Sequence, residues 1–196
     1  MLPEGPAKER LNGAIDQTAE AITEGRDAVQ DIRSSTEVSN NLAQAIGALG
    51  HELAASDATP HHAAFGISVE GTPRDLHPIV RDDVYRIAGE ALRNAFRHAQ
   101  ARQIEVEILY EDRQFQLIVR DDGKGLDPAV LNKQMPPGHW GLPGMRERAK
   151  LIGGKLEVWS KQASGTEIEL TIPAVLAYTA SRAPRWRRWL RSRRGV

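Results

Sequence analysis

The sequence predicts an α+β fold, in which helices cover one face of a mixed, mostly antiparallel sheet and a long helix precedes the sheet. Two observations predict it. Strand-like alternation of apolar and polar residues occurs in two pairs of neighbouring segments, each pair joined by a short polar turn, which is typical of hairpins. Helical periodicity occupies separate, longer segments. Hairpins and helices separated in this way favour an antiparallel sheet with helices on one side.

Each expected element follows from its local pattern of apolar residues. Apolar residues three and four apart predict helices over 38–55, 79–99 and 141–152. Alternation predicts strands over 65–70, 104–110, 115–119, 156–160 and 167–172. Segment 127–138, rich in proline and glycine, is expected to be a loop.

Residues 7–34 predict one long helix with an apolar seam. The seam residues are spaced four and three apart: Leu11, Ile15, Thr18, Ile22, Gly25, Val29 and Ile32. This spacing is the geometry of helices packed at a shallow angle, and one helix cannot bury such a seam alone. We therefore expect a partner helix, from another copy or from sequence outside this chain. The alternative is an amphipathic helix that lies on its own domain.

A carboxylate and an amide lie one helical turn apart in the segment EALRNAFRHA. Glu90 and Asn94 are four residues apart, so they share one helix face, off the apolar stripe. An amide oxygen suits Mg²⁺, which keeps several waters and needs few protein ligands. A carboxylate can orient or deprotonate a water or a hydroxyl group. Glu90 and Asn94 are our candidate catalytic residues, and Asn94 is our candidate metal ligand; a solvated polar helix face is the alternative.

The segment DDGKGL follows an apolar strand. Asp121 ends that strand, where its carboxylate can accept a hydrogen bond from an adenine amino group. Gly123 and Gly125 allow the main chain to approach a ligand closely. A surface turn is the alternative, because one glycine-spaced loop is a weak signal.

A second glycine-rich segment, GHWGLPGMRERA, opens the helix predicted over 141–152. Unpaired N–H groups at a helix start bind phosphate, and the helix dipole favours the anion. Loop and cap chemistry is the alternative. His98 is a candidate phosphate contact and His139 a candidate lid residue.

Together these segments resemble the ATP-binding domain of sensor histidine kinases, within the superfamily that includes gyrase, heat-shock chaperone and mismatch-repair ATPases. Residues 90–99 resemble the N box, residues 121–125 the DxGxG box and residues 138–149 the second glycine box. The form GLPGMRERA is similar to the kinase subfamily that partners response regulators with helix-turn-helix output domains. The resemblance covers about residues 65–173.

The resemblance implies the Bergerat α/β sandwich, with ATP and Mg²⁺ as cofactors. Asn94 would be the magnesium ligand, and Asp121 would read the adenine. A mobile lid would span roughly residues 127–140. The other implied nucleotide-binding residues are His98, Gly123, Gly125, Leu126, His139, Gly141, Leu142, Gly144, Met145 and Thr166.

The resemblance also implies a reaction and partners. The γ-phosphoryl group of ATP would move to a histidine on a homodimeric helical bundle, then to an aspartate on the receiver domain of a response regulator. Residues 1–56 would be a partial dimerisation and histidine-transfer region, 57–175 the ATP-binding catalytic domain and 176–196 a basic tail.

The acceptor histidine is where this sequence departs from the family pattern. Residues 7–34 contain no histidine, so they resemble the second bundle helix. We do not accept His51, beside Glu52, as the acceptor, because it lies beyond the bundle seam. We therefore expect the chain to bind ATP–Mg²⁺ without autophosphorylating alone.

Two alternative functions stay open. An anti-sigma-type serine kinase shares the nucleotide boxes, but the long seam helix argues against it. A nucleotide-binding or dimerisation module without transfer activity is the alternative from a different class. A chaperone or topoisomerase ATPase is not expected, because the predicted strands end near Pro173.

Composition and charge indicate a soluble protein with an unusual end. The absence of cysteine excludes disulfides and thiolate metal sites, and no apolar run approaches the roughly 20 residues of a membrane helix. The expected location is the cytoplasm, either for a separate protein or for the cytoplasmic part of a membrane-bound sensor.

The formal net charge of zero conceals a split between the body and the tail. Seven of the 26 basic residues are arginines in segment 182–196, which has no acid, so residues 1–181 carry a net charge of −7. Trp186, Trp189 and Leu190 lie among these arginines, which suggests contact with an anionic membrane surface; a disordered cationic end is the alternative. Nucleic acid is not expected as a partner.

Overall fold

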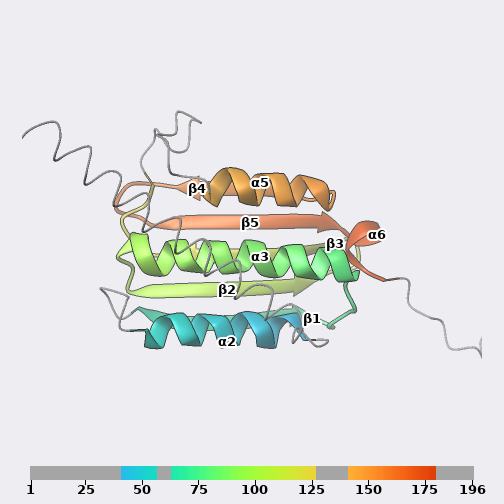
Figure 1. The fold of residues 1–196 in the computed structure, drawn as a ribbon, viewed down its shortest axis with the longest axis horizontal. Helices are drawn as coiled ribbons and strands as arrows, with labels where there is room; N and C mark the ends of the chain where they lie inside the picture. Colours follow the sequence, from blue (N-terminus) through green and yellow to red (C-terminus); the bar gives the residue numbers. More distant parts are fainter. Residues whose placement is uncertain (1–40, 57–62, 127–140, 180–196) are drawn as a thin grey trace, which may run out of the picture.

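The computed structural model describes residues 41–56, 63–126 and 141–179. The long helix predicted over residues 7–34, the predicted lid over 127–140 and the arginine-rich tail lie outside these ranges. Within them the chain folds into two layers, a five-stranded sheet and a layer of helices (Figure 1).

The sheet has five strands in the order β1-β2-β3-β5-β4. The strands are β1 (Ala64–Gly71), β2 (Gln103–Tyr110), β3 (Gln114–Asp121), β4 (Lys155–Ser160) and β5 (Thr166–Pro173). β1 and β2 are parallel, and the other three pairs are antiparallel. The mixed, mostly antiparallel sheet is therefore confirmed, and each strand begins or ends a residue or two beyond its predicted bounds.

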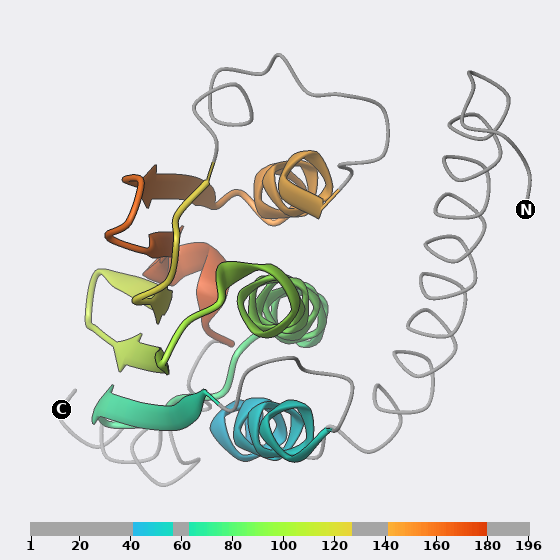
Figure 2. The same ribbon diagram turned by 90° about the vertical axis from the view of Figure 1, so that its left-hand side faces the viewer.

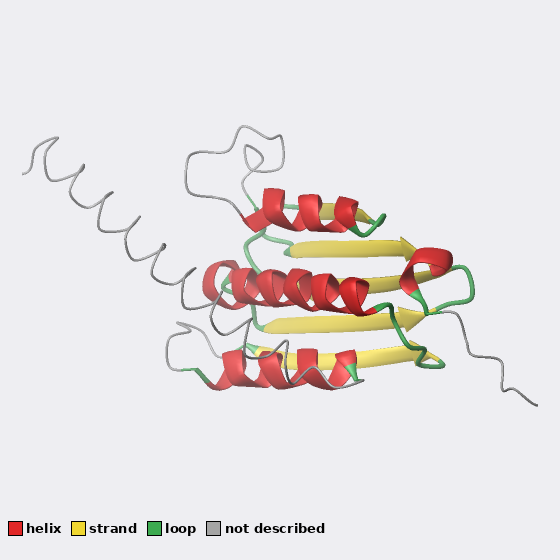
Figure 3. Ribbon diagram, turned by 45° about the vertical axis from the view of Figure 1, so that its right-hand side comes forward, coloured by secondary structure: helices red, strands yellow, loops and turns green. Residues whose placement is uncertain are grey.

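Three helices cover one face of this sheet, and no described element covers the other face, which we call the open face (Figures 2 and 3). They are α2 (Leu42–Ala55), α3 (Pro78–Asn94) and α5 (Gly141–Leu151). α3 lies in the middle of the layer, and α2 and α5 pack against it on either side. Among the described residues no helix has the length and apolarity needed to span a membrane.

The core lies between the two layers and follows the predicted apolar patterns. The α3 side chains Val84, Ile87 and Leu92 have no exposed surface. They meet alternate residues of the strands, such as Ile108 and Leu170, which are also fully buried. Each such side chain contributes about 1.5–3 kcal/mol relative to an exposed one. α2 shares this core through Leu42 and Ile46.

Two features were not predicted from the sequence. The helix predicted to run to residue 99 ends as a π-helical turn, η1 (Ala95–Ala99), followed by Gln100 in the left-handed conformation. A short helix, α6 (Ala174–Ala177), follows β5. Leu76 and Tyr178 then form an isolated antiparallel bridge, which joins the segment after α6 to the β1–α3 loop.

Candidate functional site

Asp121 is the last residue of β3, and its side chain points to the helix-covered face. Alternation along β3 places it with the buried Leu117 and Val119, and its register partner on β5 is Thr166. The Asp121 carboxylate accepts a hydrogen bond from the N–H of Gly123 at 3.0 Å. Partial burial raises its pKa above the ordinary value, although hydrogen bonds from Gly123 and Thr166 oppose the shift. A carboxylate that is partly stripped of water is a strong acceptor for a ligand donor.

The carboxylate of Asp122, the next residue, bonds the main chain instead of facing the helices. This carboxylate accepts hydrogen bonds from the backbone N–H groups of Arg102 at 2.7 Å and Gln103 at 2.9 Å. These bonds fix the start of β2 beside the end of β3. Of the two adjacent acids, Asp122 therefore holds the main chain, whereas Asp121 faces the helix-covered side.

Backbone segments from three parts of the chain meet around Asp121. Lys124 donates its N–H to the carbonyl of Ala99, at the end of η1, at 2.8 Å. A Cβ at Gly123 would overlap the same Ala99 carbonyl. Gly165, in the β4–β5 turn, has φ +89°, and a Cβ there would overlap the Asp121 carbonyl. The loop after β3 is thus held against the end of η1 and the β4–β5 turn.

Ser160, at the end of β4, joins the same two loops through its hydroxyl, and it was not among the residues selected from the sequence. Its Oγ accepts the N–H of Leu126 at 2.8 Å and donates to the carbonyl of Gly165 at 2.9 Å. It also lies 3.1 Å from Oγ1 of Thr166. Its position opposite Thr166 at the strand end is visible only once the β4–β5 register is known.

Glu90 and Asn94 lie on one face of α3, as their spacing predicts. The amide Nδ2 of Asn94 donates to Oε1 of Glu90 at 3.1 Å, and Arg93 lies 3.7 Å from the other Glu90 oxygen. Because the amide nitrogen is used in this way, the Asn94 carbonyl oxygen faces away from Glu90. No group among the described residues donates a hydrogen bond to that oxygen, so it is available to a hard cation.

The N-terminus of α5 lies beside this pair. A Cβ at Gly141 would overlap Oε1 of Glu90 and would lie 3.2 Å from Nδ2 of Asn94, so the close approach depends on a glycine. Gly144, one turn later, has open space beside it. The first N–H groups of α5 therefore begin next to the polar face of α3, where they have no partner within the helix.

The remaining candidate residues fall into three groups. Leu142 and Met145 are buried in the core, so their side chains support α5 and only their main chain could face a ligand. Leu126 is partly buried against the core, and His98 is exposed on η1. His139 lies outside the described residues.

The two polar clusters lie at the same end of the helix-covered face. Asn94 precedes Ala99 by five residues, which corresponds to about 7 Å along a helix axis, and Ala99 contacts the loop that follows Asp121. The arrangement combines a carboxylate acceptor, an amide oxygen and the first N–H groups of α5, which have no partner within the helix. These groups suit the amino group, the metal and the phosphates of a purine nucleotide.

A separate cavity of about 220 Å³ lies at the other end of the sheet. Its lining includes Arg74, Arg81, Tyr110 and Thr179. None of the candidate residues named above lines it. The grouping of polar side chains therefore identifies the candidate site, and the cavity does not.

Comparisons with known proteins found a matching family and proteins with similar sequences. Residues 79–176 match the sequence profile of a family described as histidine kinase-, DNA gyrase B- and HSP90-like ATPases. The chain is 40% identical over 94 residues to sensor histidine kinase LiaS of Bacillus subtilis, which is 48% of this chain and 25% of LiaS. It is 38% identical over 93 residues to sensor histidine kinase YdfH of the same organism, 47% of this chain and 22% of YdfH. The chain thus spans about a quarter of the length of these curated relatives.

Solved structures share the fold. The blue-light activated histidine kinase of Erythrobacter litoralis aligns with a TM-score of 0.60 at 18% identity, over 82% of this chain and 51% of that one. The histidine kinase domain of the same protein aligns with a TM-score of 0.55 at 19% identity, over 67% and 58% of the two chains. At such identities the likeness establishes the fold alone.

Proposed function

This chain belongs to the family of histidine kinase-, DNA gyrase B- and HSP90-like ATPases, and we propose that it is the ATP–Mg²⁺-binding catalytic part of a two-component sensor histidine kinase. The observation that carries the proposal is the meeting of Asp121, the Glu90–Asn94 pair and the start of α5 at one end of the helix-covered face. The names of the relatives support the choice of a kinase within the family.

The adenine end of the nucleotide lies, in this proposal, against Asp121. Its carboxylate accepts the adenine amino group, and Thr166 lines the same strand ends. Gly123 and Gly125 let the loop pack closely against the main chain of Ala99 and Lys161, and this packing would shape the wall beside the ring. A charged acceptor makes this hydrogen bond roughly twice as strong as a neutral one.

The phosphate end lies between α3 and α5. The N–H groups at Gly141, Leu142 and Gly144 face the phosphates, and the positive end of the α5 dipole favours their charge. Asn94 would hold the metal through its side-chain oxygen, and a bound Mg²⁺ would neutralise charge on the transferring phosphoryl group. His98 is the proposed side-chain contact to phosphate from η1.

The proposed reaction is transfer of the γ-phosphoryl group to a histidine on a bundle helix outside this sequence. The bond between the γ-phosphorus and the β–γ bridging oxygen breaks, a phosphorus–nitrogen bond to the imidazole forms, and ADP leaves. Glu90, held in place by Asn94, orients the attacking group or takes its proton. The phosphoryl group then passes to an aspartate on a receiver domain, and the full-length protein acts as a homodimer.

Calorimetric titration of ATP–Mg²⁺ tests the nucleotide site. We expect Asp121→Asn to weaken binding by about ten- to a hundredfold, because the amino donor loses a charged acceptor worth about 1.5–3 kcal/mol. Asp122→Asn is the matched control, since Asp122 bonds only backbone N–H groups among the described residues. Equal affinities for wild type and Asp121→Asn would refute the proposed adenine contact.

A second experiment separates the kinase from its alternatives. We expect labelled phosphate to appear on the histidine of a separately made first bundle helix when this chain and ATP–Mg²⁺ are added, and not on this chain alone. Nucleotide binding without any transfer would favour the inert module. Label on a serine of an added protein would favour the anti-sigma-type kinase.

A further inference from the structure

The two layers of the molecule carry opposite charge. The helices α2, α3, η1, α5 and α6 hold seven basic and five acidic side chains, a net charge of +2. The five strands hold seven acids and two basic residues, a net charge of −5. Six of these acids alternate outward, away from the helices, and form with Arg120 and Lys155 what we call the acidic face: Glu70, Glu105, Glu107, Glu157, Glu167 and Glu169.

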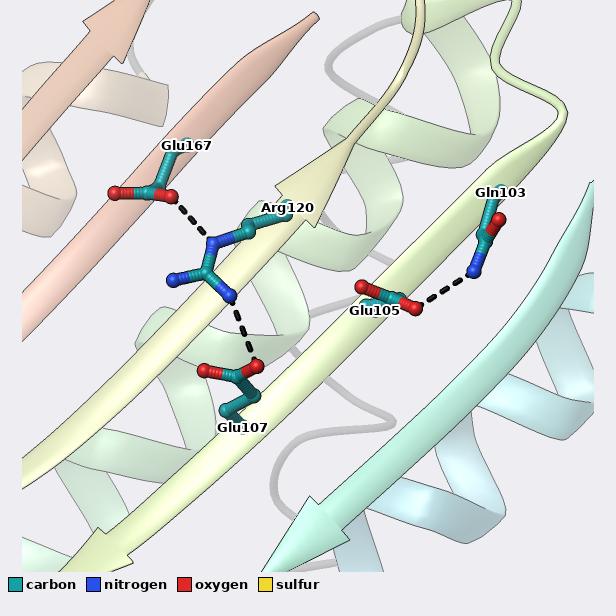
Figure 4. A network of polar contacts seen from close by, with 5 residues as sticks. All are labelled: Gln103, Glu105, Glu107, Arg120 and Glu167. Carbon is teal, nitrogen blue, oxygen red and sulfur yellow. Dashed lines mark hydrogen bonds and ion pairs between the residues drawn. The ribbon is translucent and has the colours of Figure 1, made fainter.

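The acidic face is only partly neutralised by its own cations. Figure 4 shows Arg120 between Glu107 and Glu167, with the helices behind the sheet. Its guanidinium lies 2.9 Å from Glu107 and also pairs with Glu167, so one positive charge serves two carboxylates. Lys155 pairs with Glu157 at 2.8 Å. Six acids and two cations still leave the acidic face with a net charge of −4.

Two acids on this face accept hydrogen bonds only from neutral groups among the described residues. Glu105 accepts a hydrogen bond from the amide of Gln103 at 2.6 Å. Glu169 accepts from Gln116 at 2.7 Å and from Thr171 at 3.0 Å. Glu169 also lies directly opposite Glu157 in the register, and like charges in that position repel. A cation laid across these strands would relieve the repulsion.

The face also offers apolar surface between its charges. Trp159, in the same row as Arg120 and Glu167, is 47% exposed. Ile118 projects to this side as well, opposite Glu107 and Glu169 in the register, but it is only 8% exposed, so Trp159 supplies most of the apolar surface. A ligand for this surface would therefore combine cations with aromatic or aliphatic groups.

Segment 182–196 of the same chain has this composition and begins close by. It carries seven arginines, no acid, two tryptophans and a leucine. The last described residue, Thr179, is bonded to Asp75, and Tyr178 donates to the carbonyl of Gln114 at the end of the sheet where β3 begins. Two residues separate Thr179 from Arg182, and the three residue steps span about 10 Å when extended.

The length of the segment suits the sheet. The 12 residue steps from Arg182 to Arg194 extend to about 40 Å, whereas an eight-residue strand spans about 25 Å. On the helix side, the cavity beside Thr179 is lined by two cations, Arg74 and Arg81, and one acid, Asp75, so it attracts a basic segment less than a surface of six acids does. Charge therefore directs the segment to the acidic face.

We propose that the arginine-rich segment 182–196 docks on the acidic face of its own sheet, with arginines near Glu105, Glu157 and Glu169 and an aromatic side chain near Trp159. This is an intramolecular contact, and it does not depend on nucleotide binding.

Cysteine cross-linking tests the proposal directly, because the chain has no cysteine of its own. One cysteine replaces Ser192 in the tail. The second replaces Ser68, which faces outward on β1 opposite Glu107, or, as the control, Ala48, which is exposed on α2. β1 and α2 lie at the same edge of the molecule (Figure 2). Ser68 points to the face of the sheet away from the helices, whereas α2 lies on the helix-covered side, so the two cysteine pairs differ mainly in which face they probe. We expect intrachain disulfide formation at least tenfold faster with Ser68→Cys than with Ala48→Cys. Equal rates, or cross-links only between chains, would overturn the proposal.

Charge variants complete the experiment. Glu105→Gln with Glu169→Gln should reduce the faster rate at least fivefold, as should 1 M salt, because the contact is electrostatic. The matched control is Asp112→Asn with Glu147→Gln, which removes the same charge from exposed positions off the face and should leave the rate unchanged. An equal loss in both pairs of variants contradicts docking at this face.

Anionic vesicles distinguish a membrane as the occupant. Vesicles of phosphatidylcholine with phosphatidylserine should bind the Glu105→Gln, Glu169→Gln protein more tightly than the wild type, because the tail is released from the face. Equally tight binding by both proteins would show that the tail serves a membrane instead.

Discussion

The two faces of the sheet hold their polar groups in different ways. At the end of the helix-covered face, Asp121 and Ser160 are held by main-chain groups from loops far apart in the sequence. On the open face, Arg120 is held by the long side chains of Glu107 and Glu167 on neighbouring strands. The first arrangement is fixed by the course of the main chain, and the second by strand register and side-chain length. We therefore expect substitutions at the first to be severe and specific, and those at the second to be mild and sensitive to salt.

The largest expected effect is at Gly165, where the main chain itself forms the site. Gly165→Ala forces a side chain into φ +89° and against the Asp121 carbonyl, so we expect a loss of about 3 kcal/mol in the free energy of unfolding. Denaturant titration measures it. Gly66→Ala, on β1 with open space beside it, is the control and should change stability by less than about 0.5 kcal/mol. Similar values for the two variants would contradict the distinction between the faces.

The pH dependence of nucleotide binding is the next largest effect. Burial raises the pKa of Asp121, and only the ionised carboxylate is the strong acceptor, so affinity should fall as the pH falls through that raised pKa. In the free protein the sign is opposite: protonated Asp121 stabilises the fold at low pH, and this stability is lost as the pH rises through the raised pKa.

Titrations of wild type and Asp121→Asn over a pH series isolate this group. The phosphates titrate in both experiments, so the ratio of the two affinities reports Asp121 alone. We expect the wild-type advantage of tenfold or more to shrink toward unity at low pH. A ratio that stays constant with pH would show that the carboxylate is not the acceptor.

Ser160→Ala should have an intermediate effect. The N–H of Leu126 and the carbonyl of Gly165 each lose a partner, which costs about 1–2 kcal/mol of stability and should weaken ATP binding severalfold. Ser160→Thr keeps the hydroxyl and should recover the affinity. Ser164→Ala, an exposed serine in the same turn, is the control. Affinity that falls in parallel for Ser160→Ala and Ser164→Ala would contradict a specific role for Ser160.

The smallest effect is expected on the open face. Arg120→Gln removes the cation between two carboxylates. All three side chains are partly exposed to solvent, so we expect a loss of only about 0.5–1 kcal/mol, most of it absent in 1 M salt. Thermal unfolding at low and high salt measures it, with the exposed Arg113→Gln as the control. A loss comparable to that of Gly165→Ala would remove the contrast between the two faces.

The fold was largely predictable because its elements are long and regular. The alternation in β2 and the stripe on α3 each follow from a local period, and both are confirmed by burial. The parallel pairing of β1 with β2 was not specified, because it joins segments about 40 residues apart through α3. The π-turn at residues 95–99 has no distinct sequence period and depends on the tertiary contact between Ala99 and Lys124.

The candidate site was predictable where one segment carries the information. Glu90 and Asn94 bond each other as their spacing implies, although their catalytic roles stay predictions. Asp121 was singled out from the sequence, and its role as adenine acceptor stays a prediction. The role of Asp122 was not predictable, because its bonds to the N–H groups of Arg102 and Gln103 depend on the pairing of β2 with β3. The side chains of Leu142 and Met145 are buried, since the core side of α5 needs apolar residues at those positions.

The tie at the end of the described chain has a consequence for synthesis. The Thr179 N–H bonds the carbonyl of Asp75, and His77 bonds the carbonyl of Ala177, across about a hundred residues of intervening chain. These contacts raise the contact order, so they should form late in folding. During translation, the hydrogen bonds of Asp75 and His77 to this segment cannot form until Ala177 and Thr179 have left the ribosome. Until then, the main-chain groups of Asp75 and His77 stay solvated, and the emerging protein depends on the β2–β3 hairpin and α3 for its earliest order.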